Sequence, residues 1–426
     1  MTSSEFLLEL LDNYWNYIIS LIICSVIFYF LFRNKVRSIT DPLLVSIISA
    51  VLADSIVVYL SISNLMPKQH TIFFLIGQTL FFAIYQYYIP SRNEIVVDEE
   101  LVESEREDYL LFEICILIYL FCTLYSWYLN GVPIFNSSRF EINIDNSSGI
   151  LGLLSKISNA VLLYLVIYSF HITNSEQYIK GYVYLLIISL LCLLGGSKGF
   201  ILTIVSGYFF YYCFYINKFP KIQFKYIAII IATPLLAISI AGIAGENSSA
   251  LLVYLYRLLA YGDIYWYAYP DDAISSITIQ APFLNMSSLL LGPFRHIFDF
   301  GLTDDVMQTA GGILFEQIYD YFPEKGAPNS PVFITSWVYF RWNGLFMILL
   351  IAWIGSLFYN RLHPMERSLP NCCIRGLMIN VSLCWNDIYL FFYYIWSVII
   401  FTFIFIGVKY INSYFENKEQ TFKTCA

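Results

Sequence analysis

The chain has 426 residues, of which 58% are hydrophobic and only 13% are charged, and its mean hydropathy is +0.66. Soluble domains carry about 25% charged residues, so this composition excludes an ordinary soluble protein. The net charge of −8 gives no sign of nucleic-acid binding. The nine cysteines are scattered and form no C-x-x-C motif, so neither a zinc site nor a disulfide framework is indicated.

Apolar runs long enough to cross a bilayer recur from one end of the chain to the other. Because helices are the structures that such runs adopt in lipid, we predict an all-α polytopic membrane protein. About eleven transmembrane helices (10–12) are expected, at 14–32, 42–63, 71–89, 109–129, 150–170, 179–195, 199–216, 224–243, 334–359, 371–386 and 388–412. No soluble domain interrupts the chain, so residues 1–426 are expected to form a single integral membrane domain that includes the large loop 244–333.

The distribution of lysine and arginine predicts the orientation of the chain. The short basic loops FRNKVR and NKFPKIQFK favour an N-terminus outside and a C-terminus in the cytoplasm. The largest loop, 244–333, then lies outside the cytoplasm, together with segment 130–149 and the hinge 195–199. The predicted topology therefore places most of the polar, glycine-containing loops on one side of the membrane.

Loop 244–333 is too long to be a simple connector and combines aromatic, arginine and aspartate residues. Aromatic rings can stack on sugars, and arginine grips phosphate in bidentate fashion. These residue types therefore suit an anionic, sugar-bearing, lipid-linked ligand. The alternative is that the aromatics line the membrane interface and that Arg257 extends its charge to the headgroups.

Lys198 stands in the hinge Gly195-Gly196-Ser197-Lys198-Gly199, between two apolar runs. The glycines permit close backbone approach, and the free N–H groups of the following helix favour an anion. The alternative is a lysine that only anchors the helix end among lipid headgroups. The hinge is not a Walker A loop, which needs G-x-x-x-x-G-K-[ST] after a strand.

The hinge, the element Gly131-Val132-Pro133-Ile134-Phe135 and the large late loop resemble those of the Wzy-type O-antigen polymerases. The stretch Asn329-Ser330-Pro331-Val332 resembles the H-N-x-[YF]-L segment of the related O-antigen ligases. The position of the ligase histidine is Pro328 here, so a catalytic histidine cannot be carried over to it.

The resemblance implies a fold similar to the GT-C glycosyltransferases, in a multi-pass protein of the bacterial inner membrane. It also implies a reaction, in which a glycan moves from undecaprenyl pyrophosphate to the non-reducing end of the next lipid-linked repeat unit. The reaction takes place at the periplasmic face, without nucleotide sugar, metal or other cofactor, and inverts the anomeric carbon. A membrane protein that regulates chain length is an implied partner.

This reaction requires cations for the departing diphosphate and a group that activates a sugar hydroxyl. The basic residues expected to contact the diphosphate are Lys198, Arg257, Arg295 and, as a weaker candidate, Arg139. The residues ranked as base or acceptor-positioning groups are Asp263, then His296, then Asp271 and Asp272. Further substrate contacts are expected from Ser197, Tyr261 and Asn329.

Two rival functions remain open. An O-antigen ligase transfers finished polymer instead of extending it, and the proline at position 328 counts against it. A flippase for lipid-linked oligosaccharides belongs to a different class. Transporters typically show inverted repeats and interrupted helices, and the sequence predicts neither.

Replacing Lys198 by Ala is expected to reduce long-chain glycan to single repeats while the protein remains in the membrane. Lys198→Arg should preserve more of the chain length, because the positive charge is kept. Electrophoresis of glycan ladders from complemented deletion strains measures both effects. Full-length polymer from Lys198→Ala would contradict the role in phosphate binding.

Overall fold

The structure is a computed structural model in which the described residues are 1–91, 105–133, 150–175, 177–195, 200–220, 256, 258–279, 282–291, 309–319, 328–360 and 366–425. Over these residues the protein is helical and contains no β-strand, as the sequence predicts. The predicted span 224–243 and much of loop 244–333 lie outside the described residues.

Within the described residues, six helical segments are long and apolar enough to cross a membrane. They are Tyr14–Phe32, Pro42–Ile62, Arg106–Leu129, Leu154–Asn174, Val332–Asn360 and Ile388–Phe415. Two shorter apolar segments, Tyr178–Leu194 and Phe200–Ile216, coincide with further predicted spans. The described residues therefore support an all-α membrane protein, whereas the expected total of eleven spans stays a prediction.

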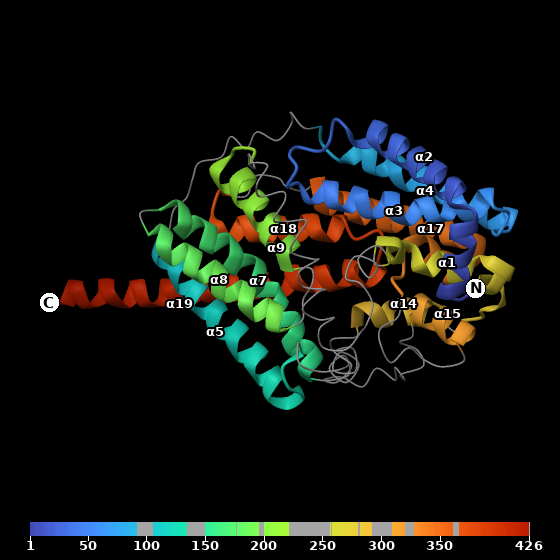
Figure 1. The fold of residues 1–426 in the computed structure, drawn as a ribbon. Coiled ribbons are helices and arrows are strands. Elements are labelled where there is room, and N and C mark those ends of the chain that lie inside the picture. The colour runs from blue at the N-terminus through green and yellow to red at the C-terminus, as the bar shows by residue number, and fades with distance from the viewer. Residues whose placement is uncertain are drawn as a thin grey trace.

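The helices form two groups (Figure 1). The first group contains α2 (Tyr14–Phe32), α3 (Pro42–Ile62), α4 (Lys68–Tyr88) and α17 (Gly344–Asn360). The second contains α5 (Glu105–Asn130), α7 (Ile150–Asn174), α8 (Tyr178–Leu194) and α9 (Phe200–Phe210), which continues into the π-helix η2 (Tyr211–Ile216). Helices α18 (Leu369–Ser382) and α19 (Ile388–Cys425) pack against α7 and connect the groups.

The ends of several helices follow from local sequence. The side chain of Asp41 caps α3 by accepting a hydrogen bond from the Leu43 N–H at 3.0 Å, and Pro42 occupies the first helical position. Helix α1 (Ser3–Asp12) begins with a capping box formed by Thr2 and Glu5. Its Phe6 ring stacks on Trp266 with centroids 4.3 Å apart, so the N-terminal helix is attached to the late loop.

The predicted span 334–359 coincides with the apolar segment Val332–Asn360, but a turn that the sequence did not predict divides this segment into two helices. Helix α16 (Val332–Phe340) ends at Arg341, whose φ of 52° turns the chain back on itself. Helix α17 starts three residues later, at Gly344. A Cβ atom at Gly344 would lie 2.3 Å from the Ser336 carbonyl oxygen, so the two helices form a tight hairpin there.

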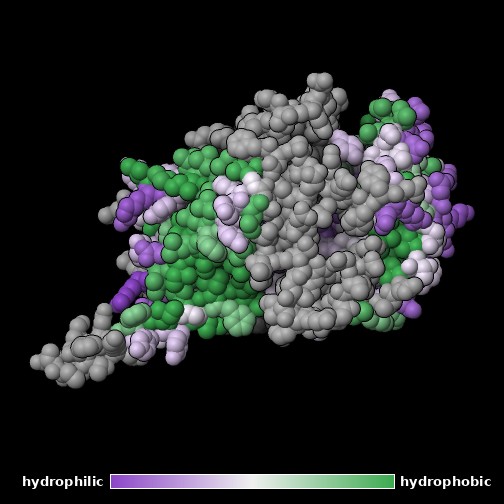
Figure 2. All heavy atoms as spheres, turned by 90° about the horizontal axis from the view of Figure 1, so that it is seen from below, coloured by the Kyte–Doolittle hydropathy of each residue, from purple (hydrophilic) through white to green (hydrophobic). Residues whose placement is uncertain are grey.

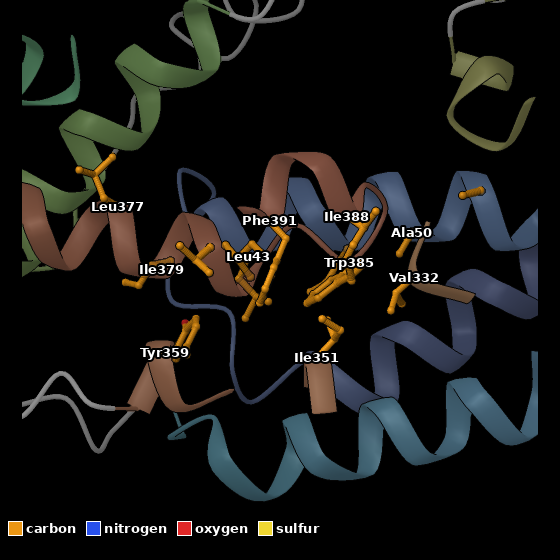
Figure 3. Close-up of a cluster of buried hydrophobic side chains, with 14 of the residues drawn as sticks. Leu43, Ala50, Val332, Ile351, Tyr359, Leu377, Ile379, Trp385, Ile388 and Phe391 are labelled. Carbon is orange, nitrogen blue, oxygen red and sulfur yellow. The ribbon is translucent and has the colours of Figure 1, made fainter. Parts of the chain in front are cut away.

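A second break separates α18 from α19 inside the bundle. Residues 383–387 connect them and carry Trp385, whose ring contacts Phe81, Phe82 and Tyr85 on α4. The Val332 N–H donates to the Trp385 carbonyl at 3.2 Å, and the Ile388 N–H donates to the Ser330 carbonyl at 2.9 Å. The first residue of each of the helices α16 and α19 thus donates a hydrogen bond to the segment that precedes the other helix. Trp385, Val332 and Ile388 are labelled in Figure 3.

The outer surface is apolar over a wide area. Figure 2 shows a continuous hydrophobic region on the half of the molecule that contains the second helix group, with hydrophilic side chains gathered toward the ends. Large apolar side chains of α5 and α8 are exposed there, including Leu117, Phe121, Tyr182 and Leu186. An exposed apolar surface of this extent fits contact with lipid tails.

Gly344→Ala is expected to destabilise the protein by about 1–3 kcal/mol, because the added methyl group would clash with the Ser336 backbone. Gly407→Ala on α19 is the matched control, since a Cβ atom there meets nothing within 4 Å. Thermal unfolding of both variants in detergent measures the difference. Equal unfolding temperatures for the two variants would show that the hairpin contact is absent.

Candidate functional site

A pocket of about 350 Å³ opens at one end of the first helix group. It is lined by Met1, by the turn between α3 and α4 at 64–67, and by Pro270, Asp271 and Asp272. Three segments that are distant in sequence therefore meet at the same end of the bundle. The topology prediction expects all three segments on one side of the membrane, and that side stays a prediction.

The backbone around the pocket adopts conformations that L-residues rarely take. Asp271 and Asp272 both have positive φ, of 57° and 54°, and Asn64 across the pocket has a φ of 57°. Left-handed backbone costs roughly 1–3 kcal/mol per residue outside glycine, with Asn and Asp the most tolerant types. Such strain is found at functional sites, and here it directs two consecutive aspartates toward a pocket.

Asp272 connects the pocket to a buried histidine. Its Oδ1 lies 2.6 Å from His70 Nε2 and accepts a hydrogen bond from the Ser275 hydroxyl at 2.7 Å. The His70 side chain is 1% exposed, whereas the Asp272 side chain is 40% exposed. His70 stacks near Tyr269 and meets the edge of Trp337, with centroids 5.5 Å and 4.7 Å away. His70 and Ser275 therefore fix the Asp272 carboxylate on one side, and its other side is accessible from the pocket.

The charges of this pair follow from their surroundings. Burial lowers the pKa of His70, and this effect outweighs the opposing contribution of Asp272. Burial acts to raise the pKa of Asp272, but hydrogen bonds from Ser275 and His70 and the charge of Arg341 outweigh it, so this pKa lies below its usual value. At neutral pH the site consequently combines an ionised carboxylate with a neutral imidazole that donates through Nε2.

Arg341 fixes the segment that carries Asp272. From the tip of the α16–α17 hairpin, its guanidinium donates to the carbonyls of Ile274 at 2.9 Å and Ser275 at 3.2 Å, and also to that of Ile277. These carbonyls lie at the end of the short helix α13 (Ala273–Ser276), which Asp272 precedes. The hairpin therefore positions the carboxylate through a single arginine.

Only part of the predicted site can be compared with the structure. Asp271 and Asp272 line the pocket, and their role as acceptor-positioning residues stays a prediction. Asp263, at the start of α12 (Asp263–Ala268), is not among the residues that line it. Tyr261 and Asn329 are half-buried and do not line it either. The predicted residues that lie outside the described residues are Arg139, Ser197, Lys198, Arg257, Arg295 and His296.

Asp263 lies in a separate, buried environment. Its Oδ1 is buried and has no hydrogen-bond partner among the described residues. Burial raises the pKa of Asp263 to about 7, and the nearby carboxylate of Asp387 adds to the rise. Asp387 itself caps α19 by accepting a hydrogen bond from the Tyr389 N–H at 2.9 Å.

The sequence analysis missed the buried partners of the site. His70 gave a usable signal, since it follows Pro67 in a turn predicted on the same side as the large loop. Arg341 was the lone charge within an apolar run of 29 residues, Val332–Asn360. Asp54 on α3 is also buried and accepts a hydrogen bond from Gln78 Nε2 on α4 at 2.9 Å. Buried carboxylates within membrane helices are rare, and each is a candidate functional residue.

The described residues offer no group of three or more His, Cys, Asp or Glu side chains that could hold a metal ion. The polar side chains that meet at Asp272 are His70 and Ser275. A carboxylate hydrogen-bonded to a histidine and facing an open pocket can accept a hydrogen bond from a hydroxyl group and orient it.

No protein-family model, curated protein or solved structure matches this chain. The resemblance to Wzy-type polymerases consequently stays a prediction from sequence.

Asp263 is expected to make stability depend on pH. Its pKa is about 7 in the folded protein against a usual value of 3.8, so the folded state binds the extra proton between these values. Stability contributed by the protonated carboxyl is therefore fully present below the lower value and lost as pH rises toward 7. Asp263→Asn should reduce the fall in unfolding temperature between pH 5 and pH 8, and Asp263→Glu should retain it. An unchanged pH dependence in Asp263→Asn would contradict the assignment.

Proposed function

We propose that this protein is a membrane glycosyltransferase of the Wzy type, which extends lipid-linked oligosaccharides at the pocket lined by Asp271 and Asp272. The observation that carries the proposal is the Asp272 carboxylate, which is open to the pocket and hydrogen-bonded to the buried His70. The proposal puts the pocket at the periplasmic face of the bacterial inner membrane, with lipid tails entering between helices.

In this proposal the acceptor hydroxyl of the incoming repeat unit donates a hydrogen bond to Asp272. The hydroxyl oxygen attacks the anomeric carbon of the donor, a new glycosidic bond forms, and the bond to the pyrophosphate oxygen breaks. The electron pair departs with the diphosphate, and the anomeric configuration inverts. The hydroxyl proton passes to the Asp272 carboxylate as the hydroxyl becomes acidic late in the reaction.

His70 and Ser275 act as positioning residues in this scheme. Both contact the same oxygen, Oδ1, and leave Oδ2 with only a long contact of 3.5 Å from Gln69 Nε2. A carboxylate held in this way presents its second oxygen to the acceptor hydroxyl in one orientation. This alignment of the reacting groups would increase the rate of glycosyl transfer. Neutralisation of the departing diphosphate remains assigned to Lys198, Arg257, Arg295 and Arg139 by prediction.

The interrupted helices favour a second candidate, a flippase for lipid-linked oligosaccharides. Helices α16 and α19 both begin within the bundle, and transporters often bind substrates at such discontinuous helices. The glycosyltransferase is the better-supported candidate, because the strained aspartates and the pocket lie at the end of the bundle.

The proposal predicts that Asp272→Asn lowers polymerisation by on the order of 100-fold or more, because the carboxylate that accepts the proton is lost. His70→Gln, which removes only the positioning contact, should have a smaller effect. The measurement is the glycan ladder of a deletion strain complemented with each variant, with membrane levels checked. Asp12→Asn, an exposed carboxylate on α1 that does not line the pocket, is the matched control.

The same strains separate the candidates. Loss of polymerisation leaves one repeat unit on the lipid core, whereas loss of a flippase removes all external repeat units. Loss of a ligase leaves polymer on the carrier lipid and none on the core. Full-length polymer from Asp272→Asn would refute the assigned role of the pocket.

A further inference from the structure

A buried arginine lies at the end of α3 opposite the pocket. Arg37 precedes α3, whereas the pocket turn at 64–67 follows it. A helix of 21 residues is about 30 Å long, which matches the apolar thickness of a bilayer. The two features therefore lie about a membrane thickness apart, and Arg37 does not belong to the proposed glycan site.

The guanidinium of Arg37 makes no hydrogen bond with the described residues, although the Asp41 carboxylate attracts its charge. The residue is 2% exposed, and its Nε, Nη1 and Nη2 atoms are all buried without a hydrogen bond. The nearest acid in sequence, Asp41, uses both carboxylate oxygens to accept backbone N–H groups, from Arg37 at 2.9 Å and from Leu43 at 3.0 Å. The guanidinium carbon instead lies 5.8 Å from the centroid of the Tyr359 ring. Buried donors that lack acceptors are costly even when an opposite charge lies nearby.

A second buried arginine converges on the same region. Arg375 on α18 is 1% exposed and lies 5.9 Å from the centroid of the Phe214 ring in η2. Cys213, also in η2, lies near Arg37, and Cys372 lies near both Cys213 and Arg375. Arg367 donates to the Tyr215 carbonyl in the same π-helix at 2.6 Å. Three guanidinium groups from different segments thus surround η2.

The chemistry of these side chains selects the class of ligand. Guanidinium groups match phosphate geometry, because they donate several hydrogen bonds in a fixed plane. Helix α2, which leads to this turn, exposes Ile22, Val26 and Phe30 on its apolar face. A lipid lying along that face would bring its headgroup to the α2–α3 turn. Free phosphate offers the same group from the aqueous side.

We propose that Arg37 and Arg375 form a binding site for a phosphate group, supplied by an anionic lipid headgroup or by free phosphate, at the end of the bundle opposite the pocket. The bound anion supplies the hydrogen-bond acceptors that Arg37 lacks among the described residues. It stabilises the junction of the α2–α3 turn, η2 and α18.

The test uses the full-length protein purified in detergent and depleted of lipid. Phosphatidic acid and diacylglycerol form one pair of probes, since they differ only in the phosphate group. Inorganic phosphate and chloride at equal ionic strength form the second pair. We expect phosphatidic acid or inorganic phosphate to raise the unfolding temperature of the wild type by several degrees over its partner probe.

Arg37→Gln should abolish this rise, and Arg37→Lys should keep part of it because the charge remains without the planar fork. Arg33→Gln, an exposed arginine in the same turn, is the matched control and should keep the full rise. If Arg37→Gln does not fold, the comparison of Arg37→Lys with the wild type carries the test.

A rise with phosphatidic acid alone identifies a headgroup, and a rise with inorganic phosphate identifies a free anion. The proposal is overturned if neither probe stabilises the wild type, or if Arg33→Gln loses the rise as fully as the Arg37 variants. Glycan ladders of the pocket variants do not bear on this result, so the two proposals can fail independently.

Discussion

Two backbone hydrogen bonds inside the bundle support the arrangement of the whole site. They join Val332 to Trp385 and Ile388 to Ser330, at the points where α16 and α19 begin. In an apolar core an open N–H or carbonyl group is costly, so a helix can begin there only when another segment satisfies its end. The α16–α17 hairpin depends on this pairing. The hairpin carries Arg341, and Arg341 holds the segment that presents Asp272.

The positions of the long helices could be predicted because lipid-facing helices consist of continuous apolar runs. Helices α2, α3, α5 and α7 fall where hydropathy expects them. The break at Arg341 could not be predicted in the same way, because its surroundings from Val332 to Asn360 are as apolar as an uninterrupted span. A turn made by one positive φ and a close helix contact has almost no signature in composition.

The candidate site was predictable to a similar, partial extent. Asp271 and Asp272 could be singled out as acids in a loop predicted to be external, since charged residues are visible in the sequence. The role of His70 depends on a contact across 202 residues that only folding creates. For Asp263 the sequence suggested a role that the structure does not support. Its position in a predicted loop suggested an exposed carboxylate, but the Asp263 carboxylate is buried and does not line the pocket. The sequence predicts which residues lie on the same side of the membrane, whereas the packing of the helices determines which side chains are in contact.

The interrupted helices also determine the order in which the chain can complete its fold. Helix α16 has nine residues, about 14 Å, and is too short to cross a bilayer alone. Its first N–H group finds the Trp385 carbonyl, which is synthesised only after α17 and α18. The pocket end of the bundle therefore cannot reach its final geometry until α19 begins to form, so a chain that stops before Trp385 lacks the contact that secures the start of α16.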